Sequence, residues 1–362
     1  MLSKTKIYID KKSLEIIAQD SFISDNHYKN IIEIFRRHAD LYLDVTEEEL
    51  DSFREPQDLN DPGDIYAFIE GKDLPWPSSA TKNFEAINDE GNRPDINGSI
   101  IYILNKKEDV KQLREKYGVW AIYIDDINDD IFYYDFTPDL DVETIPGTNE
   151  NVWQSILSEE ESLLPPSNSI VISDSNLLTN NKTNKTTGEN HFCSLVNLKS
   201  LLDVLLPPII DVTYYILIVC PPTSKFEEGK TNKLVRKWIK EIRSLRDYPI
   251  VVEFILTTKT VHSRDLYTNN YQIHLDKGFY VFEPWSRKVR KEGASHNNVK
   301  FFTYLYSPFK RGKTDIDSAI VDLRLIYKSY DAFLRKTGVS KIIDLIDEPI
   351  KSCDFSKNRI LF

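Results

Sequence analysis

The chain has 362 residues, of which 41% are hydrophobic and 28% are charged. This composition is typical of a soluble protein, and the length is sufficient for two domains with ordinary cores. The most apolar stretch, residues 201–220, contains Asp203, Asp211 and two prolines, which excludes it as a membrane span. The three cysteines show neither a disulfide pattern nor a metal-ligand spacing, so we expect a reducing, cytoplasmic environment.

The net charge of −11 is divided unevenly along the chain. Residues 1–165 contain 16 basic and 36 acidic residues, whereas residues 166–362 contain 30 basic and 21 acidic residues. Such an asymmetry is typical of two modules that meet different partners. We therefore expect a two-domain α/β protein, with an acidic α/β domain at 1–136, a linker at 137–166 and a basic domain at 167–362.

Short apolar runs alternate with helical patterns in the acidic domain, which predicts a small α/β fold. The helix predicted at 107–117 is followed by Gly118, a residue that favours helix ends. The linker contains one short predicted helix at 152–157. The predicted strands of the acidic domain are 6–10, 41–45, 99–104 and 120–125.

Carboxylates end three of these predicted strands, at Asp10, Asp44 and Asp125. Carboxylates gathered at the carboxyl edge of a parallel sheet can bind one or two Mg²⁺ ions and support phosphodiester cleavage. The opening segment KIYIDKKSLE resembles the first strand of PIN-type nucleases, and this resemblance implies the same chemistry. The simpler interpretation is that an acidic domain ends many strands in Asp without binding a metal.

The basic domain shows the clearest alternation of elements. Strands and helices follow one another with short joints, which indicates a mainly parallel sheet. Ligands of such sheets bind beyond the carboxyl ends of the strands. The predicted elements are a strand at 169–173, a helix at 194–206, a strand at 214–219, a helix at 232–246, a strand at 249–257 and a hairpin of 271–275 with 278–282.

His262 and Arg264 follow the last parallel strand, and residues two apart in an extended chain point the same way. Asn269 and Lys277 come next in the same block. From Val252 to Phe282 the order is an apolar strand, His-x-Arg, a polar Asn, an apolar strand, and a basic residue with Gly before an aromatic. This order resembles the MIT_C domain, a lipid-binding relative of the phospholipase D fold.

A catalytic phospholipase D site carries two copies of His-x-Lys-x4-Asp. The one copy here has Arg264 in place of Lys and Asn269 in place of Asp. Arg can still bind phosphate, but Asn cannot replace a carboxylate that orients and charges a histidine. The resemblance therefore implies anion binding more than catalysis, with His262 as the candidate catalytic residue. The phosphate-binding candidates are His262, Arg264, Asn269, Lys277, Arg287, Lys288 and Arg290.

The helix predicted at 232–246 has apolar residues along one side and basic residues along the other. A basic stripe of this density can lie along a phosphate backbone or an anionic membrane surface. It is equally typical of the solvated face of a helix that covers a sheet. The basic residues are Lys233, Arg236, Lys237, Lys240, Arg243 and Arg246.

The sequence leaves three functions open. The first is a module without chemistry or cofactor that binds nucleic acid or anionic phospholipid, together with protein partners in a bacterial multi-protein system such as one that acts against phage. The second is a Mg²⁺-dependent, PIN-like nuclease that uses the N-terminal carboxylates. The third is a metal-independent phosphodiesterase in which a homodimer pairs two copies of His262.

Overall fold

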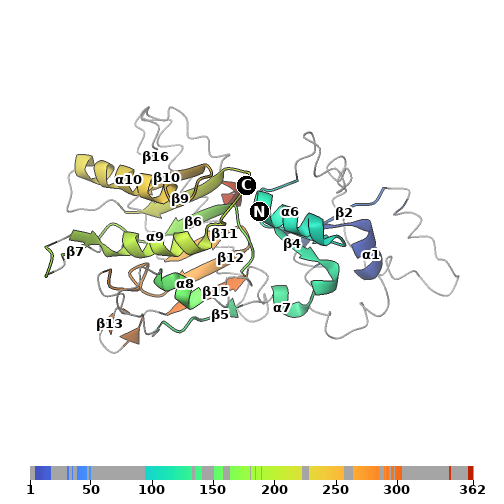
Figure 1. Cartoon of the computed structure of the whole chain (residues 1–362), viewed down its shortest axis with the longest axis horizontal. Helices are drawn as coiled ribbons and strands as arrows, with labels where there is room; N and C mark the ends of the chain where they lie inside the picture. The colour runs from blue at the N-terminus through green and yellow to red at the C-terminus, as the bar shows by residue number, and fades with distance from the viewer. Residues whose placement is uncertain are drawn as a thin grey trace. The chain divides into compact units, whose positions relative to one another are not determined.

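The computed structural model divides the chain into two compact units (Figure 1). Described residues up to Phe132 belong to the first unit, and those from Asp135 onward belong to the second. None of the helices in the described part of the chain has the length and apolar character needed to cross a bilayer. The described residues are 5–17, 31, 35, 39–46, 49, 94–132, 135–140, 151–157, 164–179, 181–183, 185–188, 190–221, 228–256, 264–284, 289, 291–292, 295–296, 298–303, 342–343 and 358–361.

A parallel four-stranded sheet forms the centre of the first unit, in the order β2-β1-β3-β4. All residues of β3 are buried, as expected for a strand that is covered on both faces. The strands predicted in the acidic domain are confirmed, with small shifts at their ends. They are β1 (Thr5–Ile9), β2 (Ala39–Leu43), β3 (Ile100–Leu104) and β4 (Trp120–Tyr123).

Two apolar clusters cover the two faces of this sheet. One contains residues of α1 (Lys11–Ile17) together with Phe35 and, from α7 (Asp129–Phe132), Phe132. The other contains residues of α6 (Lys107–Tyr117), and Tyr8 stacks on Tyr102 with ring centroids 4.7 Å apart. Helix α6 ends as predicted, because Gly118 adopts the left-handed conformation with φ of 59°.

The second unit contains an eight-stranded mixed sheet in the order β16-β10-β9-β6-β11-β12-β15-β5. Among the described strands, β6, β9 and β10 pair in parallel and the other neighbours are antiparallel. The prediction of a mainly parallel sheet in this domain is therefore wrong outside those three strands. The strands are β5 (Asp135–Phe136), β6 (Ser169–Ser173), β9 (Tyr214–Cys220), β10 (Ile250–Leu256), β11 (Asp265–Thr268), β12 (Tyr271–Leu275), β15 (Val299–Thr303) and β16 (Ile342–Ile343).

The hairpin predicted between 271–275 and 278–282 is also wrong. Strand β12 instead pairs with β11 and β15, and the turn before it is Asn269-Asn270. The hydroxyl of Thr268 supports this turn, because it accepts the backbone N–H of Asn270 at 3.2 Å and of Tyr271 at 3.0 Å. Residues 279–282 are buried without alternation, so they pack as an irregular segment rather than as a strand.

Three helices of the second unit lie across one face of its sheet (Figure 1). Helix α9 contacts both neighbours, and α10 also contacts β10. Strand β5 and helix α8, which the sequence placed at the end of the acidic domain and in the linker, belong to this unit. The helices are α8 (Val152–Leu157), α9 (Cys193–Leu205) and α10 (Glu228–Arg243).

We expect Asn269→Ala to lower the free energy of unfolding by about 2–6 kcal/mol. The buried Oδ1 of Asn269 accepts the backbone N–H groups of Asn168 and Ser169, both at 3.0 Å, and each buried donor left without an acceptor costs about 1–3 kcal/mol. Chemical denaturation measures the change. Asn298→Ala, at a partly exposed position of the same unit, is the control and should cost less than about 0.5 kcal/mol. Equal costs for the two variants would contradict the assigned role.

Candidate functional site

The structure places Arg264 where the sequence predicted it, at the carboxyl end of the parallel strands of the second unit. It directly precedes β11, and Asp265 of that strand pairs with Ser173 at the end of β6. The Arg264 guanidinium donates to the backbone carbonyl of Asp276. Lys277 follows in the same turn and is partly exposed. Two of the predicted phosphate-binding residues therefore share one edge of the sheet.

A buried carboxylate next to Arg264 changes what this edge can do. Asp174, which is 1% exposed, accepts the backbone N–H of Asn176 at 2.7 Å and of Phe279 at 3.1 Å. Burial raises the pKa of Asp174 above its ordinary value, and the two hydrogen bonds and the charge of Arg264 oppose that shift. Since Asp174 offsets the charge of Arg264, this edge is a weaker anion site than the sequence pattern indicates.

The structure does not place any other predicted phosphate-binding residue at the sheet edge that carries Arg264 and Lys277. Asn269 lies at the opposite end of β11, where it binds the N–H groups that start β6. The structure therefore does not bring Asn269 together with Arg264. The remaining candidates, His262, Arg287, Lys288 and Arg290, lie outside the described residues.

The sequence analysis missed a histidine that two carboxylates hold. His274 on β12 lies with Nδ1 2.7 Å from Asp265 and with Nε2 3.2 Å from Asp276. The Asp265 carboxylate is buried, and it also accepts hydrogen bonds from Gln272 at 2.8 Å and from Tyr267 at 3.1 Å. The hydrogen bond with Asp265 raises the pKa of His274 above its ordinary value. The spacing of His274 and Asp276, two residues apart on one strand, was the only hint of this cluster in the sequence. The second carboxylate, Asp265, could be found only from the pairing of β12 with β11.

The carboxylates proposed for Mg²⁺ lie near strand ends in the first unit, but they are not gathered into a metal site. Both oxygens of Asp10 accept backbone N–H groups at 2.7 Å, one from Ser13 and one from Asn105. Asp10 therefore links the start of α1 to the end of β3. In the part of the chain that the structure describes, no three His, Cys, Asp or Glu side chains form a metal-binding group, and Asp44 and Asp125 do not complete one with Asp10.

The exposed face of α10 carries most of the predicted basic stripe. The apolar side of the helix is buried through Val235, Trp238, Ile239 and Ile242, so its basic side faces solvent. Arg246 is not part of that surface, because its guanidinium binds Asp203 at 2.8 Å and several carbonyls at the end of α9. The exposed basic residues, called the α10 stripe below, are Lys233, Arg236, Lys237, Lys240 and Arg243.

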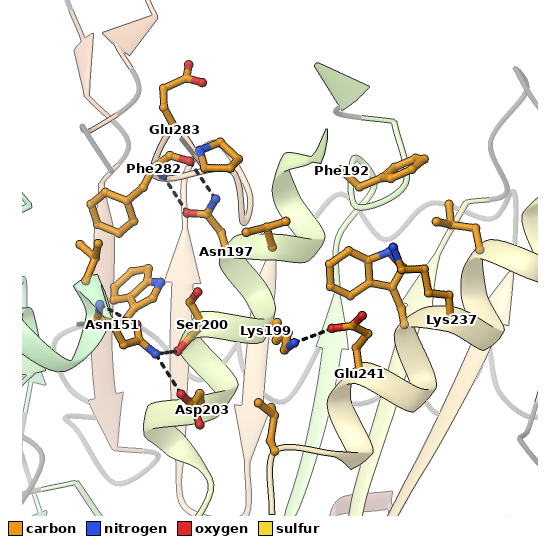
Figure 2. A pocket seen from close by; sticks show the side chains of 17 residues that line it. Asn151, Phe192, Asn197, Lys199, Ser200, Asp203, Lys237, Glu241, Phe282 and Glu283 are labelled. Carbon is orange, nitrogen blue, oxygen red and sulfur yellow. Dashed lines mark hydrogen bonds and ion pairs between the residues drawn. The ribbon is translucent and has the colours of Figure 1, made fainter. Parts of the chain in front are cut away.

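A cleft of about 560 Å³ lies beside the α10 stripe. It is lined by α8, α9 and α10, with Phe192 and residues 282–284 also contributing (Figure 2). Two sets of contacts hold its walls. Lys199 of α9 binds Glu241 of α10 at 2.5 Å, and the Asn197 side chain makes two hydrogen bonds of 2.8 Å to the backbone of Phe282. Figure 2 shows both contacts as dashed lines.

The sequence matches no family model and no curated protein. The fold and the site define the protein only by class. It is a two-unit α/β protein, and its second unit carries an exposed basic helix next to a cleft. The MIT_C and PIN resemblances stay predictions.

We expect Gly278→Ala to destabilise the second unit more than Gly188→Ala. Both glycines have positive φ, 81° and 72°, so an Ala side chain costs about 1–2 kcal/mol of backbone strain at either position. A Cβ at Gly278 would also lie 2.9 Å from Asp174 Oδ2, whereas no atom of a described residue lies within 4 Å of one at Gly188. Thermal and chemical unfolding of the two variants compare the costs. Equal destabilisation would show that Asp174 does not crowd Gly278.

We expect His274 to stabilise the fold at low pH and to lose this effect as pH rises. Its pKa is raised in the folded state, so the stabilisation is fully present below about 6.5, the unfolded value, and disappears as pH rises through the folded pKa. The difference in stability between wild type and His274→Gln should therefore shrink from about pH 6 to pH 9. Asn298→Ala provides the control, because it changes no ionisable side chain and should give a constant difference over this range. A constant difference for His274→Gln would contradict the assignment.

Proposed function

We propose that the second unit binds a phosphate polymer, and that the polymer is nucleic acid. The observation that carries this proposal is the α10 stripe, in which five basic side chains are exposed on one helix. Basic side chains that neutralise phosphates release condensed counterions, which supplies the main sequence-independent part of nucleic-acid affinity. In this proposal the unit binds without performing chemistry.

The spacing of the α10 stripe fits a polymer better than a single anion. At 1.5 Å per residue, Lys233 and Arg243 are separated by about 15 Å along the helix axis. At about 100° per residue the stripe is about 120° wide. Its five charges thus form one elongated band that several successive phosphates can follow. A lone phosphate would contact one or two of them.

The surroundings of α10 favour nucleic acid over a membrane surface. Amphipathic helices that bind membranes insert an apolar face into the boundary between headgroups and acyl chains. The apolar face of α10 is instead buried against its own unit through residues such as Trp238 and Ile239. Ile209 is the one large apolar side chain that is strongly exposed in the part of the chain described by the structure. Anionic lipid would thus be held by charge alone.

We also propose that the protein works in the cytoplasm, where thiols stay reduced. Cys193 and Cys220 are both buried free thiols. In this proposal the acidic first unit binds a protein partner that is also cytoplasmic. Mass spectrometry of the purified protein, with alkylation under denaturing conditions, measures whether these thiols are free.

We expect single-stranded oligonucleotide affinity of the full chain to fall steeply with salt. Five phosphate contacts predict a slope of log K against log [salt] of about −3.5. The double variant Lys233→Gln with Lys240→Gln should weaken binding and reduce the steepness of the slope by about 1.4, since each phosphate contact on a single strand contributes about 0.7. Fluorescence anisotropy of a labelled oligonucleotide over a range of salt concentrations measures both quantities.

The matched control removes two exposed charges from the other unit. Lys111 and Lys116 are exposed on α6, and their double substitution by Gln should leave both the affinity and the slope unchanged. If both double variants act alike, binding depends on net charge rather than on α10. Binding to anionic vesicles but not to oligonucleotides would contradict the assignment to nucleic acid.

A further inference from the structure

Two tryptophans that line the cleft between α8, α9 and α10 have buried indole N–H groups for which the described part of the chain provides no acceptor. Trp153 and Trp238 both line it and are 1% and 7% exposed. No described residue accepts a hydrogen bond from either indole Nε1. A buried polar group without a partner costs free energy, and an acceptor brought into contact with either N–H would remove that cost.

The charges of the cleft are balanced except at one point. Its three carboxylates each have a cation, because Glu241 binds Lys199 at 2.5 Å, Asp203 binds Arg246 at 2.8 Å and Glu283 binds Lys182 at 3.3 Å. Lys237 also lines the cleft and is exposed; its charge acts on Glu241, but Glu241 makes its close ion pair with Lys199. The surplus positive charge thus lies on an exposed side chain of the α10 stripe. An occupant of the cleft would therefore place its negative charge near Lys237 and not in the interior of the cleft.

The walls of the cleft suit a flat, partly apolar group. Phe192, Phe282 and the two tryptophans provide aromatic rings, and Leu234 provides aliphatic surface. The volume of about 560 Å³ lies within the range of about 300–1,000 Å³ that is usual for small-molecule sites. Because Asn197 and Lys199 are fixed by their partners, the walls are formed before any ligand arrives.

We propose that this cleft receives an unstacked base of a single nucleic-acid strand whose backbone follows the α10 stripe. A base offers a planar ring and several acceptors for indole N–H groups, and its own phosphate lies outside it, where Lys237 is. Proteins that bind single strands commonly combine a basic track with aromatic contacts to the bases. This inference rests on the proposed function, since the stripe must hold the backbone for the base to enter.

The test compares two oligomers of equal charge on the full chain. One is a single-stranded oligodeoxythymidylate, and the other has the same length but abasic sugars. We expect the strand with bases to bind about tenfold more tightly at the same salt concentration. Trp238→Phe, which removes one N–H donor but keeps an aromatic ring, should reduce this ratio. Val196→Phe, which fills the cleft from a half-buried position on α9, should bring it close to one and leave the salt slope unchanged.

Three outcomes overturn parts of the account separately. Equal binding of both oligomers with a steep salt slope would refute the base site and leave the proposed function intact. Failure of both oligomers to bind would refute the proposed function itself. Thymidine monophosphate binding as tightly as the oligodeoxythymidylate would assign the cleft to a free nucleotide instead of a strand. Melting curves of Trp238→Phe and Val196→Phe should remain cooperative. A lower affinity ratio of the two oligomers then reports on the cleft and not on unfolding.

Discussion

The packing of α10 on its own sheet is the contact on which the functional account depends. Val235, Trp238, Ile239 and Ile242 are all buried, and each such side chain contributes about 1.5–3 kcal/mol when removed from water. This burial fixes the rotation of the helix about its axis. The basic residues between these positions are therefore held outward together. A helix with the same charges but without this apolar side would not present them as one band.

The same packing creates the cleft. Helix α9 lies between α8 and α10, and the ion pair of Lys199 with Glu241 joins two of the three helices. The gap that remains has Trp153 on α8 and Trp238 on α10. Stripe and cleft meet at Lys237, which belongs to both. One arrangement of helices thus produces both the basic surface proposed for a nucleic-acid backbone and the cleft proposed for a base.

The regular elements could be predicted from the sequence because their signals are local. The alternation of apolar runs and amphipathic helices located β6, α9, β9, α10 and β10 within a few residues. The hairpin was predicted wrongly because the alternation of Tyr271–Leu275 says nothing about which strand it pairs with. Residues 279–282 look like a strand in sequence. In the structure the side chains of Asp174 and Asn197, rather than a strand, accept the N–H groups of Phe279 and Phe282.

The candidate site could be predicted only in part, for a related reason. Motif spacing placed Arg264 at the correct sheet edge, but it could not reveal the buried Asp174 beside it. Helical spacing found the α10 stripe, but it could not show that Arg246 binds the end of α9. The cleft has no sequence signal, since its lining comes from four separate segments. Partners distant in sequence decide which charged residues are available to a ligand.

Hydrogen–deuterium exchange on the full chain, with and without a saturating single-stranded oligonucleotide, tests the central claim most directly. The account predicts slower exchange in peptides from α9, α10 and residues 278–284, with peptides from β3 and α6 of the first unit unchanged. Protection around Asp10 and Asn105 with α10 unchanged would contradict it, because nucleic acid would then bind the acidic unit.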